Sequence, residues 1–297
     1  MTQVLDTAPA QMPPGRPAWR RAAEVFAENK LAMAGAGIFV LVVLFCFVGP
    51  LLYHTDQVHA NLNAVSLPPG TAGHPLGTDP DGYDELGRLM AGGQVSLELG
   101  IAAAIAATVI GTLWGAVSGY FGGVLDAVMM RIVDAALSIP VLFLLIVLAT
   151  IIRPTKITMI GVIALASWLA VARLVRGEAL SLRVREYVQA AKAMGSGSTR
   201  IVLRHITPNA VGTIIVNATF QVADAILFIA YISFLGLGLS PPTTDLGGML
   251  SNGINYVDDG FWWMIYPAGF LIVVIVIAVN FLGDALRDAF EVRLQQQ

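Results

Sequence analysis

Six long apolar runs dominate the 297-residue chain and limit what it can fold into. A helix needs about 20 consecutive apolar residues to cross the hydrocarbon core of a bilayer, and each run is close to that length. The predicted spans are 31–53, 95–119, 132–152, 157–174, 210–237 and 263–282. Charged residues make up only 12% of the chain, against about 25% in a typical soluble domain. The sequence therefore predicts an all-α integral membrane protein with six transmembrane helices.

The lysines and arginines predict which ends of these spans face the cytoplasm. If the N-terminus is cytoplasmic, only Arg88, Arg153 and Lys156 fall outside, which leaves 14 of the 17 positive residues on or near the inner side. Cytoplasmic loops of membrane proteins carry an excess of positive residues. We therefore expect both termini on the cytoplasmic side of the membrane.

The spans divide the chain into segments with different expected roles. We expect a cytoplasmic tail with an amphipathic helix at 1–30, a first transmembrane helix at 31–53, an outer loop at 54–94, a five-helix core at 95–290 that contains a cytoplasmic loop at 177–208, and a cytoplasmic tail at 291–297. Pro140 interrupts the third span and predicts a kink there, because its ring nitrogen has no hydrogen to donate.

The longest polar and basic segment between apolar spans runs from Glu186 to Pro208. Its first part has the spacing of a short helix that ends at Met194. The apolar residues on one face of that helix are Tyr187, Ala190, Ala191 and Met194. This pattern predicts a surface for contact with a partner, and the segment holds no evident chemistry.

A turn and a second helix are expected to follow this first helix. Gly195 stands where a helix commonly ends in a left-handed residue. Ser198, or Thr199 as the alternative, is expected to cap the next helix, which Pro208 closes. The product is a rigid helical hairpin, held by transmembrane spans on both sides, that suits docking to a partner protein.

The fifth span carries three polar residues on one helical face, Asn217, Gln221 and Asp224. An ionisable residue inside a span is costly and normally faces protein or water. Two interpretations stay open from the sequence. Either these residues line a translocation path, or they form a hydrogen-bonded patch between packed helices.

The second span has a ridge of small residues, each four positions after the last. Its members are Ala103, Ala107, Gly111, Gly115 and Gly119. Small residues at this spacing let another helix approach closely. That helix belongs either to this chain or to a second subunit, and the sequence does not distinguish the two.

Several of these segments resemble one known family. The run Gln189-Ala190-Ala191, followed by Gly195 and then Pro208, resembles the EAA loop of permease subunits of bacterial ABC importers. Two further segments, HPLGTD at 74–79 and SFLGLG at 233–238, resemble the C-type permease subunit of oligopeptide and dipeptide importers. The resemblance extends over nearly the whole chain from residue 31 onward, with its parts in the expected order.

The resemblance implies the architecture of a type I ABC importer permease in the cytoplasmic (inner) membrane. In that family the EAA loop inserts into the ATPase subunit as a coupling helix. The residues that the resemblance implies in ATPase coupling are Glu186, Gln189, Ala190, Ala191, Gly195, Arg200, Arg204 and Pro208. Gln189 departs from the family pattern, in which Glu is typical, and Ile229 stands where an acidic residue is common.

The resemblance also implies partners. These are a second homologous permease, two ATP-binding subunits, an extracytoplasmic peptide-binding protein and the lipid bilayer, with no nucleic acid. The sequence has no phosphate-binding loop of the form GxxxxGK[ST], so we expect no enzyme activity and no cofactor in this chain. ATP and Mg²⁺ would be bound by the partner ATPase subunits. No HExxH or CxxC pattern occurs, and Cys46 is the only cysteine, so we expect neither a metal site nor a disulfide.

We therefore expect a permease subunit that forms a pore for peptides together with a second permease. A related nickel or glutathione importer would use a similar permease and is one alternative. The alternatives of another class are a proton-coupled secondary transporter that uses Asp224, and a structural or channel subunit without energy coupling.

Overall fold

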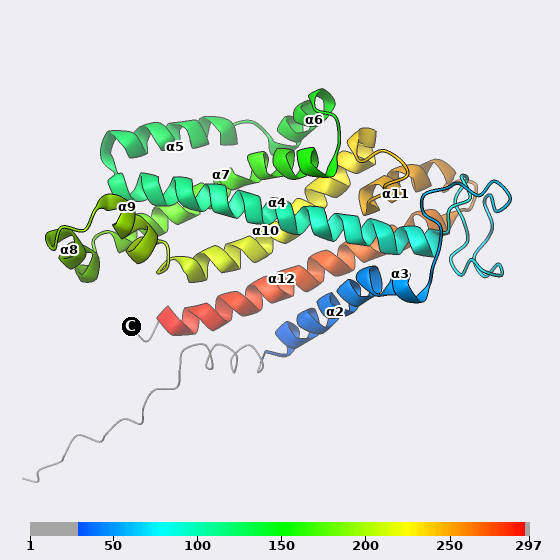
Figure 1. Cartoon of the computed structure of the whole chain (residues 1–297), viewed down its shortest axis with the longest axis horizontal. Coiled ribbons are helices and arrows are strands. Elements are labelled where there is room, and N and C mark those ends of the chain that lie inside the picture. The colour runs from blue at the N-terminus through cyan, green and yellow to red at the C-terminus, as the bar shows by residue number, and fades with distance from the viewer. Residues whose placement is uncertain (1–28, 295–297) are drawn as a thin grey trace, which may run out of the picture.

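Five helices long and apolar enough to cross a membrane form the body of the chain (Figure 1). The computed structural model describes residues 29–294, with side chains described as far as residue 290, and those residues contain no β-strand. The five spans are Lys30–Phe47, Glu85–Phe121, Lys156–Leu182, Val211–Leu237 and Trp262–Phe290. The predicted amphipathic helix before residue 29 and the predicted tail at 291–297 lie outside the fully described residues.

The elements follow one another as helices joined by short turns and one long outer loop. In chain order they are α2 (Lys30–Phe47), α3 (Gly49–Leu52), α4 (Glu85–Phe121), α5 (Gly123–Leu137), α6 (Val141–Ile151), α7 (Lys156–Leu182), α8 (Glu186–Ala193), α9 (Ser198–Ile201), a π-helical turn (Val202–Ile206), α10 (Val211–Ile232), a second π-helical turn (Ser233–Leu237), α11 (Leu246–Gly253), two 3₁₀ turns (Ile254–Tyr256 and Trp262–Met264) and α12 (Tyr266–Leu294).

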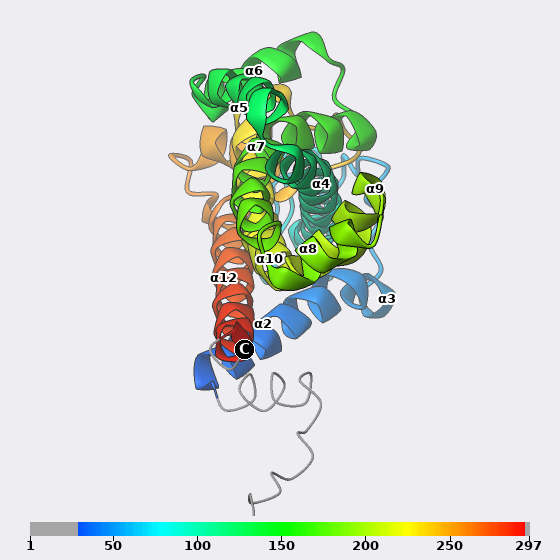
Figure 2. The same cartoon turned by 90° about the vertical axis from the view of Figure 1, so that its left-hand side faces the viewer.

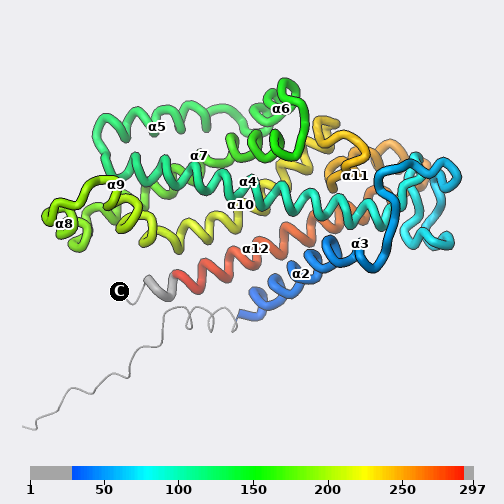
Figure 3. Tube along the Cα trace, viewed as in Figure 1, coloured from blue at the N-terminus to red at the C-terminus, as the bar shows by residue number. Residues whose placement is uncertain are grey.

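The third predicted span, over 132–152, is broken into two helices, and the first of them begins nine residues earlier than predicted. The chain there forms α5 and α6, which are bent by 83° relative to each other. The break includes Pro140, as the sequence predicted, because proline cannot continue the hydrogen-bond ladder of α5. Figure 3 shows α5 running along α4 before the chain turns into α6. The six-span prediction holds only if this bent pair counts as one span.

Helix α4 starts ten residues before the predicted second span, so the outer loop is shorter than expected. The Asp84 side chain caps the helix by accepting a hydrogen bond from the Gly87 N–H at 2.7 Å. Leu89 and Met90 are buried in the bundle. At 1.5 Å per residue α4 is about 55 Å long, well over the hydrocarbon thickness of about 30 Å, so one end of it extends beyond the membrane.

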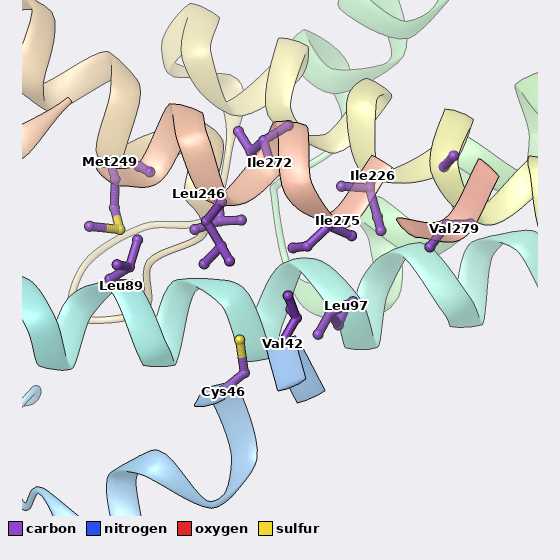
Figure 4. Packing of buried hydrophobic residues seen from close by; sticks show 13 residues of the cluster. Val42, Cys46, Leu89, Leu97, Ile226, Leu246, Met249, Ile272, Ile275 and Val279 are labelled. Atoms are coloured by element: carbon purple, nitrogen blue, oxygen red, sulfur yellow. The ribbon is translucent and has the colours of Figure 1, made fainter. Parts of the chain in front are cut away.

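The largest apolar cluster joins four long helices, α2, α4, α10 and α12, with α11 (Figure 4). Leu97 of α4, Ile226 of α10 and Ile275 of α12 are almost fully buried in it. Cys46 of α2 is buried in the same cluster, as a packed residue. This packing fixes α10 against α4 and α12 and so sets the direction in which its polar face points.

The small-residue ridge of α4 packs against α7 of the same chain. A Cβ atom at Gly111 would lie 2.5 Å from Val171 Cβ, and one at Gly119 would lie 2.6 Å from Ala179 Cβ. At Gly115 it would overlap the backbone of α7 itself. Of the two interpretations left open by the sequence, the contact within the chain is therefore correct for these three glycines.

Candidate functional site

The Glu186–Pro208 hairpin projects from one end of the bundle, at the opposite end from the outer loop (Figure 1). Helix α7 enters it through residues 183–185, and α10 leaves it from Val211. The end-on view in Figure 2 shows α8 and α9 at the end of the bundle that faces the viewer. The start of α2 and the end of α12 meet on this side, where Asn29 Nδ2 donates a hydrogen bond to Asp288 Oδ2 at 3.3 Å.

Helix α8 forms where it was predicted, but it buries a different face. Val188 is buried against Ile201 and Ile206 of the second arm of the hairpin, residues 198–206, and against the end of α7. Ala191 is buried as well. The expected apolar face was Tyr187, Ala190, Ala191 and Met194; only Ala191 of this set is buried. Met194 is 80% exposed. The second arm packs on the Val188 side of α8, which leaves the other apolar residues facing out.

The turn between the two arms depends on Gly195, as predicted. Its φ is +81°, in the left-handed region, and the Ser196 N–H closes the helix end on the Ala191 carbonyl at 3.1 Å. The predicted cap by Ser198 or Thr199 is wrong. Gly197 occupies the N-cap position, and no side chain caps α9.

The residues implied in ATPase coupling are mostly on the surface of the hairpin. Those exposed are Glu186, Gln189, Ala190, Gly195, Arg200, Arg204 and Pro208, whereas Ala191 is buried. Gln189 binds back to its own chain, because its Nε2 donates a hydrogen bond to the Arg183 carbonyl at 2.9 Å. In this structure Gln189 therefore holds α8 to the end of α7.

Three arginines at the hairpin end of α7 fix the base of the hairpin. Arg176 makes a two-pronged ion pair with Asp126 of α5, at 2.5 and 2.7 Å. Arg183 Nη1 donates a hydrogen bond to the Gly119 carbonyl at the end of α4, at 3.1 Å. Arg173 pairs with Asp134 of α5 at 2.5 Å. These partners are not predictable from the sequence, because they lie 39 to 64 positions away from the arginines in the chain.

The polar residues of α10 divide into two groups. Gln221 is buried, with 6% of its surface exposed, and points into the bundle. Asp224 is exposed and makes no hydrogen bond or ion pair among residues 29–290. Asn217 is half-buried, and its Oδ1 atom has no hydrogen-bond partner within that same range. Thr213, four positions earlier on the same face, donates to Glu178 Oε1 of α7 at 3.0 Å.

The SFLGLG segment is anchored by an acidic residue that sequence analysis did not single out. The Asp245 carboxylate accepts hydrogen bonds from Ser233 Oγ at 2.9 Å and from the Gly247 and Gly248 N–H groups. Burial raises the pKa of Asp245, and these hydrogen bonds oppose the shift in part. Ile229 is buried among apolar side chains, so it takes no part in this network.

The outer loop is folded onto the start of α4. Asp84 Oδ2 accepts hydrogen bonds from the Tyr53 hydroxyl at 2.9 Å and from His74 Nδ1 at the same distance. Arg88 pairs with Asp79 at 2.9 Å and lies over the ring of Tyr83. Among the described residues, no group of three or more His, Cys, Asp or Glu side chains is placed to hold a metal ion.

Comparison with known proteins decides the family. Residues 111–296 match the family model described as the binding-protein-dependent transport system inner membrane component. Residues 18–69 match the N-terminal transmembrane domain of oligopeptide transport permease C. The chain belongs to this family of inner membrane permeases. It is therefore a multi-pass protein of the inner membrane.

Several relatives of this permease are similar over almost their full length. The oligopeptide transport system permease protein OppC of Escherichia coli K12 is 42% identical over 280 residues, which cover 93% of this chain and 92% of the relative. The dipeptide transport system permease protein DppC of Bacillus subtilis is 37% identical over 279 residues, which cover 94% of this chain and 86% of the relative. The oligopeptide transport system permease protein OppC of Haemophilus influenzae is 38% identical over 290 residues, which cover 97% of this chain and 93% of the relative.

Proposed function

We propose that this permease is the membrane subunit of an ATP-driven peptide importer and is moved by ATPase subunits that dock on the Glu186–Pro208 hairpin. The peptide substrate is suggested by the names of the relatives, which are oligopeptide and dipeptide permeases. The observation that carries the proposal is the exposed apolar surface of the hairpin, with Met194 80% exposed, on a base fixed to α4, α5 and α7. ATP and Mg²⁺ would be bound by the partner subunits.

The mechanism follows from the way the hairpin is attached. A displacement of α8 moves α7, because only residues 183–185 separate the two helices. Helix α7 is in turn packed on the glycines of α4 and paired with α5 through Asp126. ATP-driven closure of the ATPase subunits would therefore tilt several spans together. A pore at the interface with a second permease would then open alternately to each side.

The count of lysines and arginines supports the orientation with the hairpin in the cytoplasm. Of the 17 in the chain, 14 fall on or near the side of the hairpin, and an excess of positive residues is typical of the cytoplasmic side. Two of the three expected on the outer side lie in ion pairs, Lys156 with Glu98 and Arg88 with Asp79, each at 2.9 Å.

The first experiment tests ATP-driven uptake and hairpin docking together. The complete importer, with its companion permease, ATPases and binding protein, is reconstituted in vesicles, and uptake of a labelled tripeptide is measured with ATP. We expect Met194→Asp to reduce uptake by about tenfold or more, because a charge in an apolar contact is costly and truncating central contacts commonly costs about 2 kcal/mol or more. The control is Val58→Asp, at an apolar residue of the outer loop that is 61% exposed.

The same vesicles distinguish the other functions. Uptake that continues without ATP and follows an imposed pH gradient would contradict the proposal and favour a proton-coupled transporter that uses Asp224. Uptake of nickel or glutathione in preference to peptides would keep the ATP-driven mechanism and change the substrate.

A further inference from the structure

Asp224 lies in the middle of the membrane-spanning helix Val211–Leu237 and is exposed on the surface of the chain. Asp224 is 11 residues after Thr213, which is about 16 Å along α10, and eight residues before Ile232, which is about 12 Å. The hydrocarbon core is about 30 Å thick, so this carboxylate lies in its interior. An exposed ionised group at that depth is tolerated only where it meets water or another protein group.

The groups on the same face of α10 accept hydrogen bonds or carry negative charge. Asn217 Oδ1 has no partner among the described residues, and Glu178 of α7 reaches the face through Thr213 at 3.0 Å. Helix α10 contains no lysine or arginine. The arginines at the inner end of α7 are engaged elsewhere, with Arg173 and Arg176 paired to α5. This face of α10 thus presents the carboxylate of Asp224 and no lysine or arginine of its own, and Glu178 of α7 lies about 16 Å further along at Thr213.

We propose that Asp224 makes the translocation path prefer positively charged substrate groups. The carboxylate would receive an ammonium or guanidinium group, as carried by a lysine or arginine side chain of a peptide. This inference rests on the proposed function, because it requires that the exposed face of α10 line the path.

The test compares two peptides that differ in one charged side chain. The reconstituted importer is given Ala-Lys-Ala and Ala-Glu-Ala, and the ratio of their ATP-driven uptake rates is measured for each variant. The same binding protein is used throughout, so its own preference cancels between variants. Two unit charges 4 Å apart attract each other in bulk water enough to change an equilibrium constant about fivefold. We therefore expect Asp224→Asn to lower the lysine-to-glutamate ratio by about fivefold or more.

Two control variants isolate the charge of this residue. Asp224→Glu keeps the negative charge, so the lysine-to-glutamate uptake ratio should stay within about twofold of the wild-type ratio. A twofold change corresponds to less than about half of 1 kcal/mol. Asp258→Asn removes an exposed carboxylate from the connection between the two 3₁₀ turns that follow α11 and should leave the ratio unchanged.

Three results would overturn the inference. One is an unchanged ratio in Asp224→Asn. Another is an equal loss of both peptides together with poor recovery of the companion permease, which would mean that Asp224 pairs with a cation of that subunit. A wild-type importer that takes up neither peptide would overturn the proposed function itself and this inference with it.

Discussion

Gly195 is the residue on which the shape of the hairpin depends. Its φ of +81° is a conformation that residues with a side chain rarely adopt. No described atom lies within 4 Å of the position that a Cβ would take. The cost of adding a side chain here therefore comes from the backbone alone, and a steric clash within the chain contributes nothing.

The first prediction compares this glycine with its neighbour two positions on. Gly195→Ala should destabilise the turn by about 1 kcal/mol, because a Cβ disfavours the left-handed conformation by roughly that amount. Gly197 has φ −66° and equally open surroundings, so Gly197→Ala adds no left-handed strain and loses only the preference for glycine over alanine at the N-cap of the short helix α9. We expect more ATP hydrolysed per peptide imported in Gly195→Ala only. Equal coupling ratios in the two variants would contradict this role of the turn.

Single residues differ in how far the sequence predicts them. The conformation of Gly195 was predictable because few residues other than glycine end a helix in this way. The burial of Gln221 beside an exposed Asp224 was not, because both lie on one face of α10 and only the packing partners separate them. The role of Asp245 was also hidden, since its partner Ser233 is 12 positions away.

The contact between α4 and α7 is the element-scale feature with the clearest cause. Gly111, Gly115 and Gly119 bring the two backbones so close that a Cβ at any of them would overlap α7. Sequence spacing predicted that this ridge meets a helix. It could not identify α7, because the sequence carries no mark of which helix lies opposite.

The contact between α4 and α7 is tested by comparing a substitution at Gly115 of α4, inside the contact, with one at Gly161 of α7, outside it. Gly115→Val should lower the free energy of unfolding by about 1–3 kcal/mol, because the added side chain forces the helices apart. Gly161 of α7 is exposed, and no described atom lies within 4 Å of the place where its Cβ would be, so Gly161→Val should change that free energy by less than about 0.5 kcal/mol. Thermal unfolding of the purified protein in detergent measures both. Equal shifts in the two variants would contradict close packing here.

Element boundaries were predicted less well than the presence of the elements. Hydropathy located the long spans because each is a long apolar run. It missed the first ten residues of α4, from Glu85 to Gln94, because that glycine-rich and charged stretch is buried by the outer loop and α11 rather than by lipid. Pro140 located the break between α5 and α6, but an apolar run does not reveal that the bend there is 83°.

At the scale of the whole molecule, two ion pairs on α7 agree with the thickness of a membrane. Lys156 pairs with Glu98 at one end of the helix, and Arg176 pairs with Asp126 near the other. The stretch of about 20 residues between Lys156 and Arg176 spans about 30 Å, which matches the hydrocarbon core. The hairpin lies beyond the Arg176 pair, and the outer loop lies beyond the Lys156 pair (Figure 1).

The central claim is that this permease is moved through its hairpin by an ATPase subunit. In a Cys46→Ser background, which removes the only cysteine, Met194→Cys places a single thiol on the exposed side of the hairpin. Cross-linking in the assembled importer, with and without ATP, is the most direct test. We expect a cross-linked adduct between this thiol and the ATPase subunit, and we expect the yield of that adduct to differ between samples with and without ATP. Labelling of this thiol from the outer face, or no adduct with a nucleotide-hydrolysing subunit, would contradict it.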